Sequence, residues 1–317
     1  MQENVSSAME EPTTLTFDRD GRIARITLDR PERGNGITLE MLRELESCVE
    51  SANLDPGVHV IAFAGNGTGF CGGYDLVASA ERLASSEPSA AGASATAEPG
   101  GPTDPATIAA NHDPAGAWDP VVDYQMMSRN LRGFMSLFHS DKPVICKIHG
   151  YCVAGGTDMA LCSDLIVVED RAKIGYPPAR VWGVPTSMLW AHRIGLERAR
   201  RLLLTGDSID GATAVEWGLA SEVAPAAELD EAFEALLERV ARLPVNQLVM
   251  HKLAINQSLF AQGLAGTQAL SVFLDGIARH TPEGYAFQGV AASEGYREAV
   301  RGRDEPFGDH GLDRRSP

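Results

Sequence analysis

The hydrophobic positions at the start of the chain predict two strands, a helix and a third strand, in that order. Apolar residues gather in 15–17 and 23–28, on either side of an Asp-Arg-Asp-Gly turn, which is typical of a β-hairpin. After Thr38, a favourable N-cap residue, apolar positions recur at helical spacing as far as an Asp-Pro-Gly sequence. The apolar run 58–64 then predicts a buried strand.

A second unit repeats this plan further along the chain. An amphipathic stripe that ends at Phe138 predicts a helix, and the apolar runs 144–148 and 165–168 predict two more strands. Strands that alternate with helices indicate parallel crossovers, so we expect an α/β core. From Glu197 onward the pattern is mainly helical. The clearest helical stretches there are 227–242, 245–262 and 282–301.

The segment 85–120 interrupts this pattern, because Ala, Gly, Ser and Pro dominate it and large apolar residues are scarce. Such a composition buries too little surface to offset the entropy of ordering, so we expect much of the segment to be mobile. Most of it is interpreted as a surface insertion. Around Trp118, a flexible lid over an active site is an equally good interpretation.

Composition narrows the class of protein. The 317 residues are 44% hydrophobic, enough for a sizeable core, and the formal net charge of −16 argues against nucleic-acid binding. No apolar run approaches the ~20 residues that a membrane helix needs, and the polar start does not resemble a signal peptide. The five cysteines are odd in number and form no Cys-x-x-Cys pair. We therefore expect a cytoplasmic protein with reduced thiols and no membrane partner.

Two glycine-containing loops carry the candidate chemistry. Residues 70–76 read Phe-Cys-Gly-Gly-Tyr-Asp-Leu, and residues 149–158 read His-Gly-Tyr-Cys-Val-Ala-Gly-Gly-Thr-Asp. Each loop follows an apolar run and leads into a plausible helix. Two such turns can aim two backbone N–H groups at one oxygen, which is the geometry that stabilises an enolate or a tetrahedral intermediate.

With their flanking residues, these loops resemble the motifs of the enoyl-CoA hydratase/isomerase (crotonase) superfamily. The second loop, for example, is similar to the family pattern G-x-x-x-G-G-G-x-E, and the first to F-x-A-G-x-D-L. Matches of this kind run in order over most of the chain, with the insertion between them. The matching segments are 30–37, 70–76, 142–158, 204–220 and 294–307.

The resemblance implies a fold and a substrate. The fold is a spiral of ββα units over 12–205, interrupted by the insertion at about 84–118, with a helical trimerisation region over 206–310. Homotrimers, or dimers of trimers, are implied as the assembly. The substrate implied is an acyl-CoA thioester, so coenzyme A enters as part of the substrate. No metal and no redox cofactor are implied.

By position in the family motifs, the oxyanion donors are the backbone N–H groups of Tyr74 and Gly155. The two glutamates that family hydratases use fall here on Asp158 and on Pro178. Proline cannot transfer a proton, so Asp158 is the expected acid/base residue, and burial in an acyl pocket is expected to raise its pKa. An alternative role for Asp158 is to favour the dipole of the helix that it begins.

Coenzyme A carries phosphates, so cations are expected near its site despite the acidic net charge. Arg33 is the best candidate within one subunit, and Lys252, Arg297 and Arg303 are further ones, which a trimer interface would bring in. Solvated surface charge is an equally good interpretation of each. The full set expected at the coenzyme A portion is Arg33, Asn35, Gly73, Asp75, Lys252 and Arg303.

Several functions remain open at this point. Hydration of a 2-enoyl-CoA is the first prediction, because overall similarity favours it. The absence of a second glutamate favours chemistry with one base, such as double-bond isomerisation, or a hydrolytic or retro-aldol step through Asp158. A non-catalytic acyl-CoA-binding scaffold is the alternative from another class.

Overall fold

The computed structural model describes residues 11–75 and 98–308. Its main sheet has six strands in the order β1-β2-β3-β4-β6-β9, in which only the β1–β2 pair is antiparallel. The strands are β1 (Leu15–Asp20), β2 (Ile23–Leu28), β3 (Val60–Gly65), β4 (Val144–Ile148), β6 (Leu165–Glu169) and β9 (Glu222–Ala224). The predicted hairpin and the predicted parallel core are confirmed.

A second sheet has three strands, which lie along the chain between later strands of the main sheet. Its order is β5-β7-β8, formed by β5 (Tyr151–Val153), β7 (Lys173–Gly175) and β8 (Ser208–Ile209). Since β5 leads directly into the helix that begins at Gly155, this small sheet positions the second glycine loop. The short strands β8 and β9 interrupt the region that was predicted to be mainly helical.

The helices follow the hydrophobic pattern closely, except in one region near the carboxyl end. The described helices are α1 (Leu39–Leu54), α3 (Pro105–Asn111), α4 (Pro120–His139), α5 (Gly155–Ala160), α6 (Leu189–Thr205), α7 (Gly211–Glu216), α8 (Leu229–Ala241), α9 (Val245–Ala261), α10 (Leu264–Arg279), α11 (Pro282–Glu294) and α12 (Tyr296–Asp304). Thr38 caps α1 by accepting a hydrogen bond from the Met41 N–H, as predicted. The single helix expected over 282–301 is wrong, because Gly295 breaks it at a φ of 92°.

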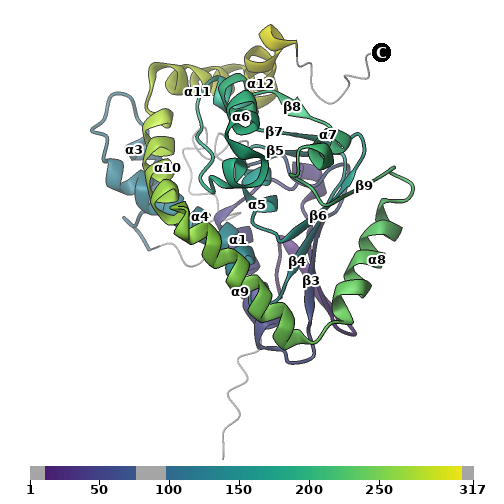
Figure 1. The fold of residues 1–317 in the computed structure, drawn as a ribbon. Coiled ribbons are helices and arrows are strands. Elements are labelled where there is room, and N and C mark those ends of the chain that lie inside the picture. Colours follow the sequence, from purple (N-terminus) through teal and green to yellow (C-terminus); the bar gives the residue numbers. More distant parts are fainter. Residues whose placement is uncertain (1–10, 76–97, 309–317) are drawn as a thin grey trace, which may run out of the picture.

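The main sheet is covered on both faces, and alternate residues of its strands supply the two cores. Ile61 and Phe63 of β3 belong to the larger core, with α1 and α4, whereas Val60 and Ala62 face α8. Figure 1 shows α8 on one side of the sheet and α4, α9 and α10 on the other. The α/β fold with a helical carboxyl-terminal region therefore agrees with the crotonase fold that the motifs imply.

The described part of the insertion is packed against the C-terminal helices. Trp118 donates from its indole N–H to the Asp123 carboxylate at 2.7 Å and stacks on the His280 ring, with centroids 4.6 Å apart. His280 contacts the same carboxylate at 2.8 Å. Residues 85–97 of the expected mobile segment lie outside the described residues.

No helix in the described ranges is long and apolar enough to cross a membrane.

Candidate active site

The two glycine loops meet edge to edge. Cys71 and Cys152 form a parallel bridge, in which the Val153 N–H donates to the Cys71 carbonyl at 3.1 Å. Gly73 has a φ of +103°, and a Cβ added there would lie 2.8 Å from the Ala154 Cβ and 3.4 Å from the Gly155 nitrogen. Only glycine permits both that backbone conformation and this close approach. The loops are therefore joined at the residues that precede Tyr74 and Gly155.

The N–H groups of Tyr74 and Gly155 are not used inside the described part of the chain. Their neighbours are paired: the Ile37 N–H donates to the Gly73 carbonyl, and the Asp75 N–H to the Ile37 carbonyl. Gly155 is the first residue of α5, where the helix itself offers no acceptor. Ala154, just before it, has a φ of 56° and a ψ of −131°, a strained conformation for a residue with a side chain. Strain of this kind often marks a functional turn.

Both loops line a cavity of about 520 Å³. Tyr74, Ala154 and Gly155 form one side of it, and the opposite side comes from α10, α11 and α12. Its apolar surface includes Trp182 and Phe287, whose ring centroids are 6.3 Å apart. This size, and the combination of apolar surface with charged side chains, suit a small-molecule site.

Asp158 lies behind the cavity wall rather than in it. Its carboxylate is buried and accepts hydrogen bonds from the Thr186 N–H at 3.0 Å, the Ser187 N–H at 3.2 Å and the Ser187 hydroxyl at 2.6 Å. Burial raises the pKa of Asp158 to about 7, although these donors act to lower it. An aspartate is one methylene shorter than the family glutamate, and here both of its oxygens hold the 186–187 segment.

Asp275 of α10 is a buried carboxylate that does line the cavity. Its Oδ1 accepts a hydrogen bond from the Val184 N–H at 3.0 Å, while Oδ2 lies 3.9 Å from the Arg279 Nε. Burial raises the pKa of Asp275, and Arg279 opposes that shift. A second carboxylate in the wall, Asp304, is held by ion pairs with Arg180 at 3.2 Å and Arg303 at 2.7 Å.

Cations concentrate around this cavity, in a chain that is otherwise acidic. Lys173, Arg279, Arg297 and Arg303 all line it. Arg303 is largely neutralised by Asp304, and Arg279 lies 3.6 Å from the Asp123 carboxylate. Arg297 is exposed and Lys173 is half-buried, so these are the two cavity cations best placed to bind an anionic ligand.

This chain is similar in sequence and in structure to known proteins. Two family descriptions, both named enoyl-CoA hydratase/isomerase, match residues 119–280 and 23–99. EchA13 of Mycobacterium tuberculosis, a relative named as an enoyl-CoA hydratase, is 30% identical over 262 residues, which are 78% of this chain and 74% of its own. The chain belongs to the enoyl-CoA hydratase/isomerase family.

Solved structures of family members agree over nearly the full length. An enoyl-CoA hydratase from Mycobacterium smegmatis is 54% identical and superposes with a TM-score of 0.87, covering 95% of this chain and 96% of its own. An enoyl-CoA hydratase/isomerase from Xanthobacter autotrophicus Py2 is 26% identical, with a TM-score of 0.77 over 93% of this chain and 98% of its own. Carnitinyl-CoA dehydratase of Proteus mirabilis is 28% identical over 72% of this chain and 74% of its own.

Several predicted ligand residues of this family member have contacts inside the protein. Asn35 is fully buried, and its amide donates to the carbonyls of Asn66 at 2.8 Å and Phe70 at 2.9 Å, which fixes the first glycine loop. The Asp75 carboxylate pairs with Arg30 at 2.8 Å. Both side chains support the loop, and neither lines the cavity.

The predicted cations divide between the cavity and the rest of the molecule. Arg303 lines the cavity, whereas Arg33 is exposed on the 3-10 helix Pro31–Arg33 and does not line it. Lys252 is buried elsewhere, and its ammonium donates to the carbonyls of Leu137 at 2.9 Å and Lys142 at 3.1 Å and to Asp164 at 2.8 Å. Within one subunit, the ammonium of Lys252 therefore holds parts of the fold together and does not face the cavity.

Pro178, which the resemblance matches to the second glutamate of family hydratases, lines the cavity. It lies in the 3-10 helix Pro177–Arg180, so the chain offers no carboxylate at this point of the wall. Sequence reasoning missed Asp275 altogether, because no family motif covers it and its helix was not predicted separately. The only available signal was an aspartate four positions before an arginine in an apolar helical stretch.

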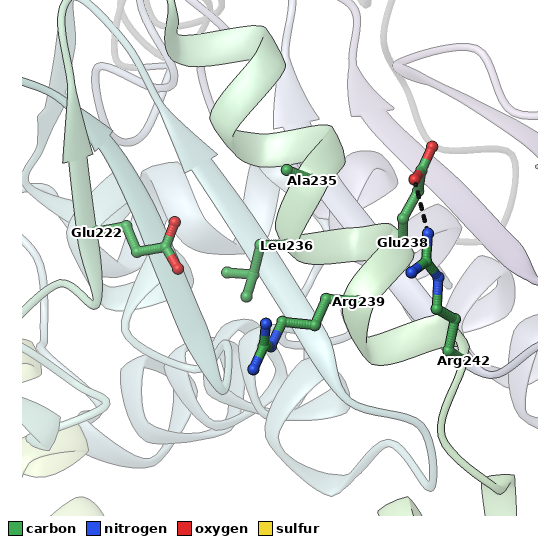
Figure 2. A pocket seen from close by; sticks show the side chains of 6 residues that line it. All are labelled: Glu222, Ala235, Leu236, Glu238, Arg239 and Arg242. Carbon is green, nitrogen blue, oxygen red and sulfur yellow. Dashed lines mark ion pairs between the residues drawn. The ribbon is translucent and has the colours of Figure 1, made fainter.

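A second hollow of about 360 Å³ lies between β9 and the outer face of α8 (Figure 2). Its charges come from Glu222, Arg239 and the Glu238–Arg242 pair, which is 3.6 Å apart and highly exposed. It contains neither a buried titratable group nor a glycine turn, so it offers no catalytic arrangement.

Proposed function

We propose that this protein binds an acyl-CoA thioester and stabilises its enolate with the N–H groups of Tyr74 and Gly155. The observation that carries the proposal is that these two N–H groups have no acceptor within the described chain, while both residues line one cavity. A thioester carbonyl gains negative charge when its α-carbon loses a proton or when its β-carbon is attacked. Fixed donors favour that charged state over the ground state.

The coenzyme A portion is expected to lie toward the cations of the cavity. Lys173 and Arg297 supply positive charge for its phosphates, and Arg303 adds a partly neutralised third. Trp182 and Phe287 supply apolar surface for the acyl chain. The acyl portion then places its reactive carbons between the glycine loops and α10.

Hydration of a 2-enoyl-CoA is the first candidate reaction. The 54% identical protein from Mycobacterium smegmatis is named as an enoyl-CoA hydratase, and this supports the same reaction here. In hydration, a water oxygen bonds to C3 while the double-bond electrons move to the thioester oxygen, and a proton is then delivered to C2. The oxyanion donors are expected to act on the intermediate charge.

Isomerisation of a 3-enoyl-CoA to a 2-enoyl-CoA is the second candidate, and Pro178 favours it. Proline cannot carry a proton, so this position offers no second acid/base group. Isomerisation needs only one carboxyl group, because the proton moves from C2 to C4 of the same acyl chain. The same enolate and the same two N–H donors serve this reaction.

A mass-spectrometric assay in heavy-oxygen water distinguishes these reactions, with 2-enoyl-CoA and 3-enoyl-CoA thioesters as probes. A gain of one labelled water at C3 would establish hydration, and double-bond migration without label would establish isomerisation. Release of free coenzyme A would replace both with hydrolysis or, with loss of part of the acyl chain, a retro-aldol step. Binding without turnover would reduce the protein to an acyl-CoA-binding scaffold.

We also propose that the protein assembles into homotrimers, alone or in pairs. An apolar stripe on α10 supports this proposal, because exposed apolar residues recur there at helical spacing. The stripe consists of Leu270, Phe273, Leu274 and Ile277, which are 40–58% exposed. Light scattering on the purified protein tests the proposal, and Phe273→Glu should lower the measured mass.

A further inference from the structure

We infer that Asp275 is the catalytic carboxylate that takes a proton and returns it to the acyl chain. The inference rests on the proposed function, since it names the proton carrier for the enolate held by Tyr74 and Gly155. It assigns proton transfer to a residue of α10, whereas the family motifs place proton transfer at the positions of Asp158 and Pro178.

The position of Asp275 is the first argument. It is 5% exposed and lines the same cavity as both oxyanion residues, as Pro178 and as Trp182. A carboxylate in this place borders the space that a bound acyl chain would occupy. Asp158, by contrast, is 1% exposed and is not part of the cavity lining.

The hydrogen bonds of Asp275 are the second argument. Among the described residues, Val184 alone hydrogen-bonds to this carboxylate, through its N–H at Oδ1. That bond fixes the orientation of the carboxyl group, and Oδ2 makes no hydrogen bond among the described residues, with the Arg279 Nε 3.9 Å away. A proton carrier needs this combination of a held side chain and one available oxygen.

Two neighbouring groups of the site are also incompletely hydrogen-bonded. The Tyr74 hydroxyl and the Arg279 Nε are buried atoms that make no short hydrogen bond in the described chain. The Asn130 side chain is the neighbour of the hydroxyl, and the Asp275 Oδ2 lies 3.9 Å from the Nε. Buried polar atoms in proteins are nearly always paired. Asp275 therefore lies beside polar groups whose hydrogen bonding within the described chain is incomplete.

The charges around Asp275 favour a carboxyl group that exchanges protons readily. Arg279 faces it from the next turn of α10, and Val184 donates from the loop before α6. The carboxylates of Asp123 and Asp158 and the hydroxyls of Tyr74 and Tyr176 lie in the same cluster. Burial and the neighbouring acids disfavour its charge, while Arg279 and the Val184 N–H keep the ionised form accessible.

One carboxyl group can carry the proton in either candidate reaction, but hydration must in addition hold a water molecule beside C3. In isomerisation, Oδ2 of Asp275 removes a proton from C2, the C–H electrons form the enolate, and the same proton returns to C4 as the double bond moves. In hydration, the carboxylate takes a proton from water while the water oxygen bonds to C3, and returns that proton to C2. Each route starts and ends with ionised Asp275 and needs no further reactant.

The test follows exchange of C2 hydrogens for deuterium in butanoyl-, octanoyl- and hexadecanoyl-CoA. This exchange reports proton transfer to the enolate whichever overall reaction the enzyme catalyses. Asp275→Asn keeps an oxygen for the Val184 N–H, so the loop before α6 should keep its place. We expect its exchange rate to fall about a hundredfold to ten-thousandfold, with thioester binding by calorimetry changed by less than about threefold.

Three further variants make the test specific. Asp275→Glu should restore part of the exchange, and Asp158→Asn should lose much less of it than Asp275→Asn. Glu283→Gln, at an exposed position in the first turn of α11, should exchange like the unchanged protein. The rate of the unchanged protein should also fall at low pH, and Asp275→Asn should abolish that limb of the pH profile.

Two results would overturn the inference, and they differ from a failure of the proposed function. Normal exchange in Asp275→Asn, with loss in Asp158→Asn, would return the proton transfer to Asp158. Equal losses in thioester binding and exchange would make Asp275 a residue of the binding site only. If the unchanged protein binds thioesters but exchanges no C2 hydrogen, the enolate proposal itself is wrong, and the inference falls with it.

Discussion

The two walls of the cavity are built on different principles. The wall from the glycine loops presents backbone: the proposed oxyanion donors are N–H groups of Tyr74 and Gly155, and buried side chains such as Asn35 hold the first loop. The wall from α10, α11 and α12 presents side chains, including Asp275, Arg297 and Phe287. A backbone donor depends on local conformation, whereas a side chain depends on how its helix packs against the core.

The two buried carboxylates illustrate the same difference. Asp158 follows the second glycine loop, and its oxygens are taken up by the 186–187 segment. Asp275 comes from a helix distant in the sequence, lines the cavity and has one oxygen without a hydrogen bond among the described residues. Proximity to a motif therefore does not decide which acid faces a ligand. Hydrogen-bond partners and cavity lining decide it.

The largest effect is expected from Gly73→Ala in the loop wall. The added Cβ would lie 2.8 Å from the Ala154 Cβ, at a φ of +103° that side chains rarely adopt, so the Tyr74 and Gly155 N–H groups should move apart. Turnover should fall about a hundredfold to a thousandfold, or about 3–4 kcal/mol in transition-state free energy. Steady-state kinetics with the active thioester measure this.

Gly21→Ala is the matched control for Gly73→Ala. Gly21 also has a positive φ, of +58°, but it lies in the β1–β2 turn with no heavy atom within 4 Å of the added Cβ. It should therefore lower stability without changing turnover. Equal turnover in Gly73→Ala and the unchanged protein would contradict the role of this loop contact.

Lys252→Met should lower stability rather than substrate affinity. The variant leaves Asp164 without its cation and two main-chain carbonyls without a donor, which should cost about 3 kcal/mol in the free energy of unfolding. Urea unfolding measures that change, and KM for the thioester should stay within about twofold. Lys173→Met, in the cavity, should give the opposite pattern. A large rise in KM for Lys252→Met would place this residue at the coenzyme A site, through a neighbouring subunit.

The parts of the molecule that were predictable from sequence are those with local causes. The hairpin, the Thr38 cap and the meeting of the glycine loops follow from turn residues, capping and motif spacing. The break at Gly295 was not predicted, because apolar residues continue at helical spacing on both sides of it. Lys252 and Asp275 were beyond prediction for a different reason. Their partners lie 88 and 91 residues away, and only packing brings them together.

The pH dependence of stability should distinguish Asp158 from the solvated acids. Its folded pKa, about 7, lies above the unfolded value near 3.8, so its contribution to stability is fully present at low pH and is lost as pH rises through 7. Between pH 5 and 7, the free energy of unfolding should fall by about 2 kcal/mol more in the unchanged protein than in Asp158→Asn. Urea unfolding of both proteins at the two pH values measures this. Parallel changes in the two would mean that Asp158 stays ionised throughout.

The smallest effect is expected from the cations, and it tests which wall holds the coenzyme A phosphates. Arg297 is exposed and lines the cavity, so Arg297→Gln should raise KM for the thioester about threefold. Because solvent reaches this charge, the difference should shrink as salt is added. Arg33 is also exposed, but it lies in the 3-10 helix Pro31–Arg33, outside the cavity lining, so Arg33→Gln should change KM less. A larger effect from Arg33→Gln would move the phosphates to the loop wall, and the helical wall would then be left with the acyl chain and its proton transfer.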